Sequence, residues 1–344
     1  MKLSRIERLF RRDKAALARP LRSRVAAAAG SALLLLPLVG MQASFAQGWP
    51  DRPVRIIVPF PPGGAIDTMT RILAPRLEAA LKQPIVVENR AGAGGVVGTE
   101  AASRSTDGHT LLMTAMGHVI VPALHKKLSY DALKDFRAMA PVAVVPNVLV
   151  VPADSPYKSV QDVLAAAKAN PGKLTYGSAG TGSSLHLTPA LFAALAKVEL
   201  THVPYRGSVA AMTDLVAGRI DMMFDSTTSI SSFVESGAIR PLAVATSKRS
   251  SAYPDVPTVA ESGLPEYAVD WWYALLAPRD LSDEALGKVA ASVAQSLKDP
   301  EIQAKFAAIK IEPMLGDTQA LQEAMERDSK KWADLISEMG IQAD

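Results

Sequence analysis

The stretch "VPFPPGGAID", residues 58–67, joins an apolar, strand-like run to a segment with helical character. It places three prolines and two adjacent glycines in one turn. Proline fixes φ near −65° and carries no N–H group, whereas glycine adopts backbone conformations that are closed to other residues. Such a turn is stiff on one side and free on the other, so we expect it to bring bare main-chain groups against a bound molecule.

Strand-like and helix-like segments alternate outward from this turn. The run "VRIIVPF" predicts a buried strand, residues 65–82 predict a helix, and "IVVEN" predicts the next strand. Pro75 is expected to kink or split that helix. Because the alternation continues along almost the whole chain, we expect an α/β fold with parallel sheets covered by helices.

The pattern restarts after Pro152, which indicates a second unit, and the run "DWWYALLAP" from Asp270 is interpreted as a return to the first. Two helices are expected to close the chain, over residues 282–309 with an interruption at Pro300 and over residues 317–339. We therefore predict a discontinuous first domain, residues 47–151 plus 273–344, and a second domain, residues 152–272. The two chain crossings between them would form a hinge.

The first 46 residues have the features of a secretory signal peptide. Nine basic and two acidic residues precede an apolar run over residues 25–39, and the small residues Ser44 and Ala46 favour cleavage after Ala46. A membrane anchor is the weaker interpretation, because a spanning helix needs about 20 apolar residues and Pro37 interrupts this run. The sequence therefore predicts export to the periplasm.

Removing this segment reverses the charge of the chain. The full sequence carries +3 and the leader contributes +7, which leaves about −4 on the exported part. The isoelectric point near 9.0 therefore belongs to the leader. No cluster of Lys and Arg with interleaved aromatic residues follows, so we expect no nucleic-acid partner.

The absence of cysteine excludes disulfides, thiol chemistry and a lipoprotein anchor. The five histidines show no spacing typical of metal ligands, so neither a metal nor a cofactor is expected.

Three loops follow a predicted strand and precede a predicted helix, at residues 60–67, 178–186 and 205–208. Ligands of open α/β sheets bind beyond the carboxyl ends of the strands, and the N-terminus of a helix favours an anion. "GSAGTGSS", residues 177–184, adds hydroxyl groups to glycine N–H groups, and a carboxylate suits that set. Ser183 stands where a P-loop needs lysine, and Val97 breaks the dinucleotide pattern in "GAGGVVG".

Several polar side chains at these loops allow two interpretations. Asp67 either contacts a substrate amine or stabilises the glycine turn, and Arg206, beside Tyr205, either clamps a carboxylate or is exposed at a helix start. His186 is either a hydrogen-bond donor near the ligand or a structural residue. A buried Asp225 would need a loop N–H group or a cationic ligand group as its partner.

A hydrolase is the competing class of function. It would use Ser183 or Ser184 with His186, but neither serine candidate at this loop, Ser178 or Ser184, lies in a G-x-S-x-G nucleophile elbow.

The blocks "PFPPGGAID", "VVENRAGAGGVVGTEA", "YGSAGTGSSLHL" and "HVPYRGSVAAMTDLVAGRIDMMF" occur in the order seen in one family. Over essentially the whole exported chain, the sequence resembles the Bug, or TctC-like, extracytoplasmic solute receptors of tripartite tricarboxylate transporters. The resemblance implies a type II-like periplasmic-binding-protein fold, in which two α/β lobes close about a hinge on a small carboxylated solute. It further implies delivery to the membrane subunits of the transporter and no catalysis; we expect a monomer.

The resemblance also implies which loops hold the carboxylate. Carried over to this sequence, they are the first turn (Phe60, Pro61, Gly63, Gly64, Ala65 and Asp67) and the loop of the second domain (Ser178, Ala179, Gly180, Gly182, Ser183 and His186). Met116 and His118 stand where many relatives have small polar residues. We expect them to make that side of the site larger or more apolar.

Overall fold

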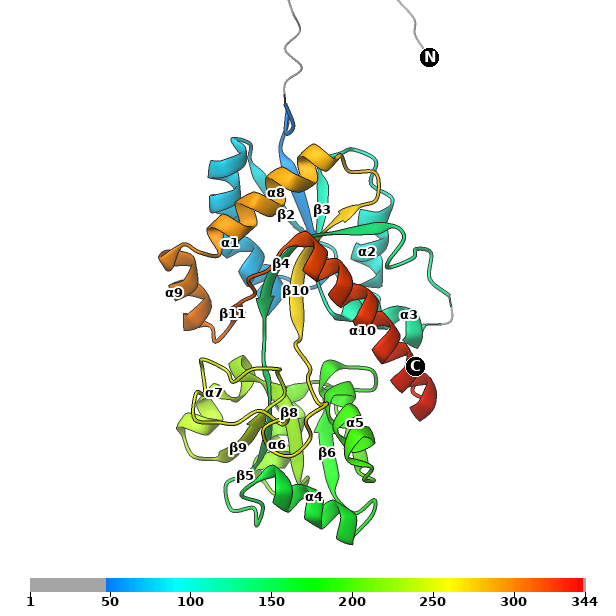
Figure 1. Cartoon of the computed structure of the whole chain (residues 1–344), viewed down its shortest axis with the longest axis vertical. Helices are drawn as coiled ribbons and strands as arrows, with labels where there is room; N and C mark the ends of the chain where they lie inside the picture. The colour runs from blue at the N-terminus through cyan, green and yellow to red at the C-terminus, as the bar shows by residue number, and fades with distance from the viewer. Residues whose placement is uncertain (1–47, 126, 343–344) are drawn as a thin grey trace, which may run out of the picture. The chain divides into compact units, whose positions relative to one another are not determined.

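The computed structural model describes residues 48–125 and 127–342 (Figure 1). The predicted signal peptide, residues 1–46, and its cleavage after Ala46 lie outside this part of the chain. Among the described helices, none has the length and apolar composition that a bilayer crossing needs.

The first of two sheets has the strand order β11-β4-β10-β3-β1-β2. Its strands are β1 (Val54–Val58), β2 (Ile85–Asn89), β3 (Thr110–Ala115), β4 (Phe136–Val144), β10 (Trp272–Pro278) and β11 (Glu312–Pro313). β1 lies between β2 and β3 and is parallel to both, so the carboxyl ends of these three strands meet at one edge.

The second sheet has the order β7-β6-β8-β5-β9. Its strands are β5 (Asn147–Pro152), β6 (Thr175–Ser178), β7 (Thr201–Pro204), β8 (Met222–Ser226) and β9 (Ile239–Val244). β6 is parallel to β7 and β8, which again brings three strand ends to one edge.

Both sheets are mixed, so the expectation of parallel sheets is confirmed only for part of each. β10 runs antiparallel to β3 and β4, β11 runs antiparallel to β4, and β5 runs antiparallel to β8 and β9. The reason is that β5 and β10 are the strands by which the chain enters each sheet from the other one (Figure 1). No crossover helix precedes them, and only a crossover helix would return the chain in the parallel direction.

Sheet membership also places the first crossing earlier than the sequence does. β4 ends at Val144 and β5 begins at Asn147, so residues 147–151 pair within the second sheet, whereas the predicted boundary followed residue 151. The second crossing ends at Trp272, one residue before the predicted boundary.

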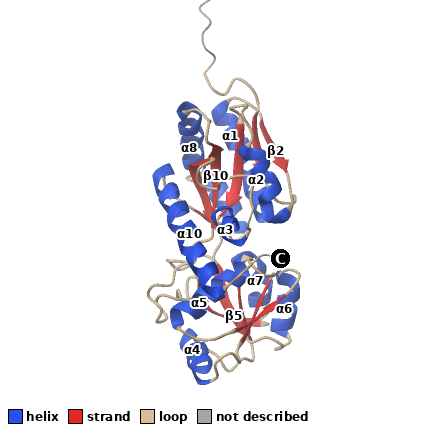
Figure 2. Cartoon of the chain, turned by 90° about the vertical axis from the view of Figure 1, so that its right-hand side faces the viewer, coloured by secondary structure: helices blue, strands red, loops and turns tan. Residues whose placement is uncertain are grey.

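Helices cover both faces of each sheet (Figure 2). Alternate residues of β1 pack on one side with α1 (Ala65–Leu81), α8 (Asp283–Ser296) and α9 (Pro300–Ala308), and on the other with α2 (Val96–Ser103), α3 (Gly117–Leu124) and α10 (Thr318–Met339). The second sheet packs with α4 (Val160–Ala169) and α5 (Ser184–Ala196) on one face, and with α6 (Ser208–Val216) and α7 (Thr227–Glu235) on the other. This two-lobed α/β arrangement confirms the predicted fold class.

Two predicted helix features had different outcomes. Pro300 begins α9 at its first turn, where proline is tolerated because the missing N–H group would have no helical partner. Pro75, by contrast, lies inside α1, which continues from Ala65 to Leu81 without a break. The buried face of α1, which includes Met69, Leu73 and Leu77, holds the helix together across the proline.

Side-chain contacts join the crossings to the last helix. Trp271 stacks on Trp332 of α10 with ring centroids 5.7 Å apart, and Lys331 Nζ donates to the Ala268 carbonyl at 2.7 Å. Trp272 Nε1 donates to Asp328 at 2.9 Å. Trp271 and Trp272 therefore pack the crossing against α10.

Candidate functional site

Three loops form a first loop cluster at the carboxyl ends of β1, β2 and β3, made of residues 59–65, 92–95 and 114–118. The Arg90 N–H group donates to the Val58 carbonyl at 2.8 Å, and Asn89 Nδ2 donates to the Phe60 carbonyl at 3.1 Å. A methyl group on Gly95 would lie 3.2 Å from the Phe60 ring. The proline-glycine turn and the glycine loop after β2 are therefore in direct contact.

Asp67 is the residue that fixes the proline-glycine turn. Its carboxylate is buried and accepts hydrogen bonds from Gly63 N at 2.9 Å, from Arg71 Nε at 3.0 Å and from Asn89 Nδ2 at 3.0 Å. The Arg71 hydrogen bond is the main cause that lowers the pKa of Asp67 to about 2. Because both oxygens are occupied, this geometry favours the turn-stabilising interpretation over contact with a ligand amine.

The turn itself is exposed. Pro61, Gly63, Gly64 and Ala65 all lie at the surface, and Gly63 has φ +85°, which disfavours any other residue. Gly64 has ordinary extended dihedrals, and a methyl group there would meet only the Pro61 carbonyl, at 3.8 Å. Gly63 is thus required by the backbone, whereas Gly64 leaves open space beside the start of α1.

The glycine loop at residues 92–95 was not predicted to be part of the site. Its four residues all have positive φ, including Ala93 at +46°. Gly98 explains how the loop lies so close to the turn, because a methyl group there would come within 2.6 Å of the Arg90 carbonyl and Pro59 Cα. The sequence did carry a signal: this loop follows a strand and precedes a helix, like the three loops that were singled out.

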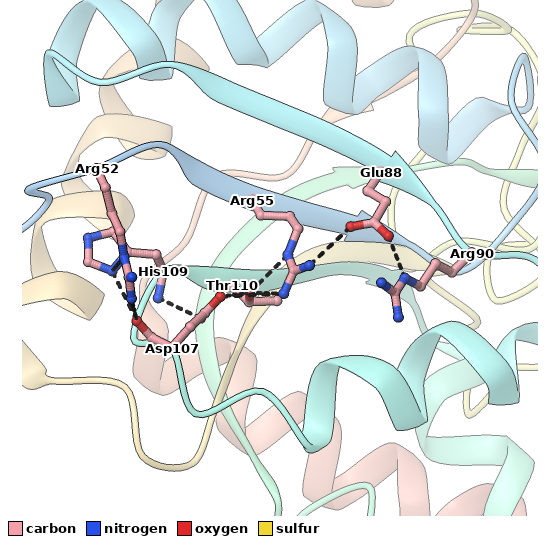
Figure 3. Close-up of polar contacts among 7 residues, drawn as sticks. All are labelled: Arg52, Arg55, Glu88, Arg90, Asp107, His109 and Thr110. Carbon is pink, nitrogen blue, oxygen red and sulfur yellow. Dashed lines mark hydrogen bonds and ion pairs between the residues drawn. The ribbon is translucent and has the colours of Figure 1, made fainter. Parts of the chain in front are cut away.

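A row of charged side chains crosses β3, β1 and β2 and ends beside this loop (Figure 3). Arg55 lies 3.4 Å from Asp107 and 3.3 Å from Glu88, and Glu88 lies 2.5 Å from Arg90. These side chains are about one third exposed, so each pair contributes little to stability. The row ends at Arg90, which leads into the glycine loop.

A second loop cluster, residues 178–184 and 204–208, lies at the ends of β6 and β7. Tyr205 N–H donates to the Ser178 carbonyl at 3.1 Å, and a methyl group on Gly180 would lie 3.5 Å from the Tyr205 carbonyl. The structure therefore brings these two predicted loops together. Ala179, Gly180, Gly182 and Ser183 are partly exposed, whereas Ser178 is fully buried.

His186 has a positioning role in this cluster. Its Nδ1 accepts a hydrogen bond from Gly182 N–H at 3.0 Å, and its ring stacks on His202 with centroids 3.9 Å apart. Burial, with a smaller effect of His202, lowers the pKa of His186 to about 4, so the ring is neutral near pH 7. His186 therefore accepts a bond from the loop through Nδ1, which favours the structural interpretation, and the neutral ring keeps its proton on Nε2.

The geometry does not support the hydrolase interpretation. The Ser183 hydroxyl donates to the Gly180 carbonyl at 2.6 Å, and His186 Nδ1 is occupied by Gly182. Ser178 does bond to His202, at 2.6 Å, but Ser178 has no exposed surface on which a substrate could bind. A nucleophile needs both a base within hydrogen-bond reach and access to substrate.

The remaining candidate residues are Tyr205, Met116, Arg206 and Asp225. The Tyr205 hydroxyl donates to Asp214 on α6 at 2.8 Å, and Met116 is buried with its sulfur 3.2 Å from Trp332 Nε1. Arg206 is exposed, with no hydrogen bond or ion pair to any described residue. Asp225 is buried and accepts from Ser226 N–H at 2.7 Å, and burial raises its pKa to about 6.

Helix N-termini at the two clusters differ from most others in the described chain. α1, α2, α3, α5 and α6 begin at these loops, and none has a side-chain cap. α4, α7, α8, α9 and α10 are each capped by a Ser or Asp side chain. Uncapped first turns leave N–H groups available, so both clusters present hydrogen-bond donors suited to an anion.

The two clusters are linked through α3. A methyl group on Gly182 would lie 3.0 Å from Leu124 Cδ1, so the 178–184 loop reaches the C-terminal end of the helix that carries His118.

Comparison with known proteins identifies the family. Residues 69–341 match the model of the tripartite tricarboxylate transporter family receptor, TctC. The chain belongs to this family. Protein BugT of Bordetella pertussis is 34% identical to this chain over 302 residues, which cover 86% of this chain and 91% of BugT.

Solved structures agree with this assignment. A Rhodopseudomonas palustris protein determined with adipate is 34% identical, with a TM-score of 0.71 over 86% of this chain and 99% of its own. MatC from the same organism, with bound malate, is 29% identical, with a TM-score of 0.68 over 84% of this chain and 100% of its own. The TctC receptors are solute-binding proteins, and their two-lobed α/β fold is the one predicted from the sequence.

Proposed function

We propose that this protein is a periplasmic receptor that holds a small carboxylate between its two loop clusters and delivers it to the membrane subunits of a tripartite tricarboxylate transporter. Adipate and malate, the ligands of two relatives, are both small carboxylates. In this proposal the exported protein is a monomer without catalytic activity, released by cleavage after Ala46. The lobe built on the first sheet closes on the lobe built on the second by a hinge motion at the two chain crossings.

The single observation that supports this proposal best is the set of uncapped helix starts. The N-termini of α1 and α5 provide free N–H groups from the two lobes, and each helix dipole places about half a positive charge there. The Ser183 hydroxyl donates away from α5, to the Gly180 carbonyl, and so does not fill the helix start itself. The loops would therefore bind a carboxylate mainly through main-chain groups.

The test is a thermal-shift screen of the protein purified from the periplasm, against mono-, di- and tricarboxylates paired with their primary amides. A ligand at one hundred times its Kd stabilises the folded state by about 2.7 kcal/mol, or roughly 4 °C for a chain of this size. Saturable shifts are expected with at least one acid and not with its amide. Indifference to every acid would contradict the proposal.

Two further measurements separate the alternatives. Turnover of activated esters that Ser183→Ala or Ser184→Ala abolishes would support a hydrolase instead. Loss of uptake of the bound acid in a deletion strain distinguishes a transport receptor from a sensor that binds the same solutes.

A further inference from the structure

A second polar feature of the first loop cluster concerns His118, at the start of α3. The side chain is 4% exposed and is held between aromatic rings, with Phe136 edge-on at 4.9 Å and Tyr130 stacked at 6.4 Å. Its Nε2 lies 2.8 Å from the Ala132 carbonyl oxygen. A carbonyl oxygen only accepts, so Nε2 carries the proton and Nδ1 of the neutral ring is an acceptor.

This acceptor has no partner among the described residues. A buried polar atom without a hydrogen bond costs about 1–3 kcal/mol, and such atoms in folded proteins usually mark a bound water or ligand. Burial also lowers the pKa of His118 to about 4, so the ring does not relieve the cost by taking up a proton near neutral pH.

His118 is also one of the residues that line a pocket of about 20 Å³, which has room for one water-sized group. The other lining residues include Phe60, Gly94, Gly95, Thr99 and Thr114, from the ends of β1, β2 and β3 and the start of α2, and Tyr130, from the segment between α3 and β4. The pocket therefore opens within the first loop cluster, beside the turn proposed to bind the carboxylate.

We propose that His118 Nδ1 accepts a hydrogen bond from a hydroxyl group of the ligand, so that the receptor selects hydroxycarboxylates over the corresponding deoxy acids. This inference rests on the proposed function, because the carboxylate would occupy the uncapped helix starts next to the pocket. It names the second group that the site recognises.

The chemistry of the pocket disfavours the other candidate groups. A second carboxylate would place its oxygen lone pairs against the lone pair of Nδ1. An ammonium group would need a counter-charge, and the described residues that line the pocket include no Asp or Glu. A neutral donor of the size of a hydroxyl group satisfies both the volume and the acceptor.

The experiment is calorimetric titration of the periplasmic protein with matched pairs, malate with succinate and 3-hydroxybutyrate with butyrate, using both enantiomers of each hydroxy acid. One hydroxy acid is expected to bind about tenfold more tightly than its deoxy partner, which is the loss expected when a buried acceptor stays unpaired. In His118→Phe the ratio should fall to about 1, while affinity for the deoxy acid changes less than about threefold. His125→Phe, at the C-cap of the same helix but outside this pocket, is the control and should keep the ratio.

The outcomes separate the two proposals. If acids bind but no pair is discriminated, the inference about His118 is overturned and the carboxylate receptor stands. If no acid binds, both fail. Should His118→Phe not fold, long-range ¹H–¹⁵N NMR of the unmodified protein still decides: the hydroxy acid must shift the Nδ1 resonance of His118 and the deoxy acid must not, and equal behaviour would refute the inference.

Discussion

Substitution of Gly64 separates ligand binding from stability. Gly64 precedes α1 with φ −76° and ψ 170°, dihedrals that any residue adopts, and a new Cβ would meet only the Pro61 carbonyl at 3.8 Å. Valine at a helix N-cap costs about 0.5–1 kcal/mol relative to glycine, and the lower entropy of the unfolded chain offsets a similar amount. Gly64→Val should therefore change the free energy of unfolding by less than about 1 kcal/mol.

The effect on binding should be much larger. The valine side chain would occupy the open space beside the first N–H groups of α1, where the carboxylate is proposed to lie. A hydrogen bond to a charged group contributes about 1.5–3 kcal/mol, so losing one weakens binding by about 10- to 150-fold. Gly64→Ala should have a smaller effect in the same direction.

The assay is calorimetric titration with an acid found in the thermal-shift screen, together with urea unfolding of each variant. Gly287→Ala, at an exposed position inside α8, is the remote control and should leave the Kd unchanged. Gly63→Ala provides the opposite contrast, because φ +85° at that residue makes the backbone itself unfavourable by about 1–2 kcal/mol. If Gly64→Val folds normally and binds within threefold of the unmodified protein, the placement of the ligand at this turn is wrong.

Asp67→Asn should lower the free energy of unfolding at pH 7 by about 1–2 kcal/mol, a value reduced to allow for solvent around the half-exposed Arg71. A series of denaturation curves should show this loss shrinking as pH falls from about 4 to 2, because the native carboxylate becomes protonated in that range. Asp225→Asn should have the opposite sign: burial raises the pKa of Asp225 from 3.8 to about 6, so ionisation of the native acid destabilises the fold increasingly as pH rises from about 4 to 6 and fully above that. The variant should therefore melt higher at pH 8, by an amount that disappears near pH 4, and an equal melting temperature at pH 8 would contradict the burial argument. Gly98→Ala should destabilise the protein by about 2–3 kcal/mol, because its methyl group would meet backbone atoms at 2.6 Å, and an unchanged urea midpoint would refute that contact.

Local patterns predicted the helices and most strand positions well, because those depend on neighbours in the sequence. Asp317 caps α10 and Pro300 begins α9, as helix-start chemistry requires. The direction of β5 and β10 was missed because it depends on which strands lie beside them after the chain crosses between sheets. The sequence pattern of a strand is the same whether it pairs parallel or antiparallel to its neighbours.

The functional site likewise has features that the local sequence predicts and features that depend on distant residues. Proline and glycine in the first turn predicted an exposed backbone, and the structure has it. Asp67 accepts hydrogen bonds from Arg71 and Asn89, and the Met116 sulfur contacts Trp332. These partners lie 4 to 216 positions away in the sequence, so the spacing of residues alone does not reveal them. The unpaired Nδ1 of His118 becomes visible only when the Ala132 carbonyl, from the segment after α3, is seen to fix the tautomer.

A crystal structure of the protein saturated with a carboxylate from the screen is the most direct measurement. The account predicts that carboxylate oxygens lie about 2.7–3.1 Å from N–H groups at the starts of both α1 and α5. A carboxylate bound away from those helix starts, or held by side chains of one lobe alone, would contradict it.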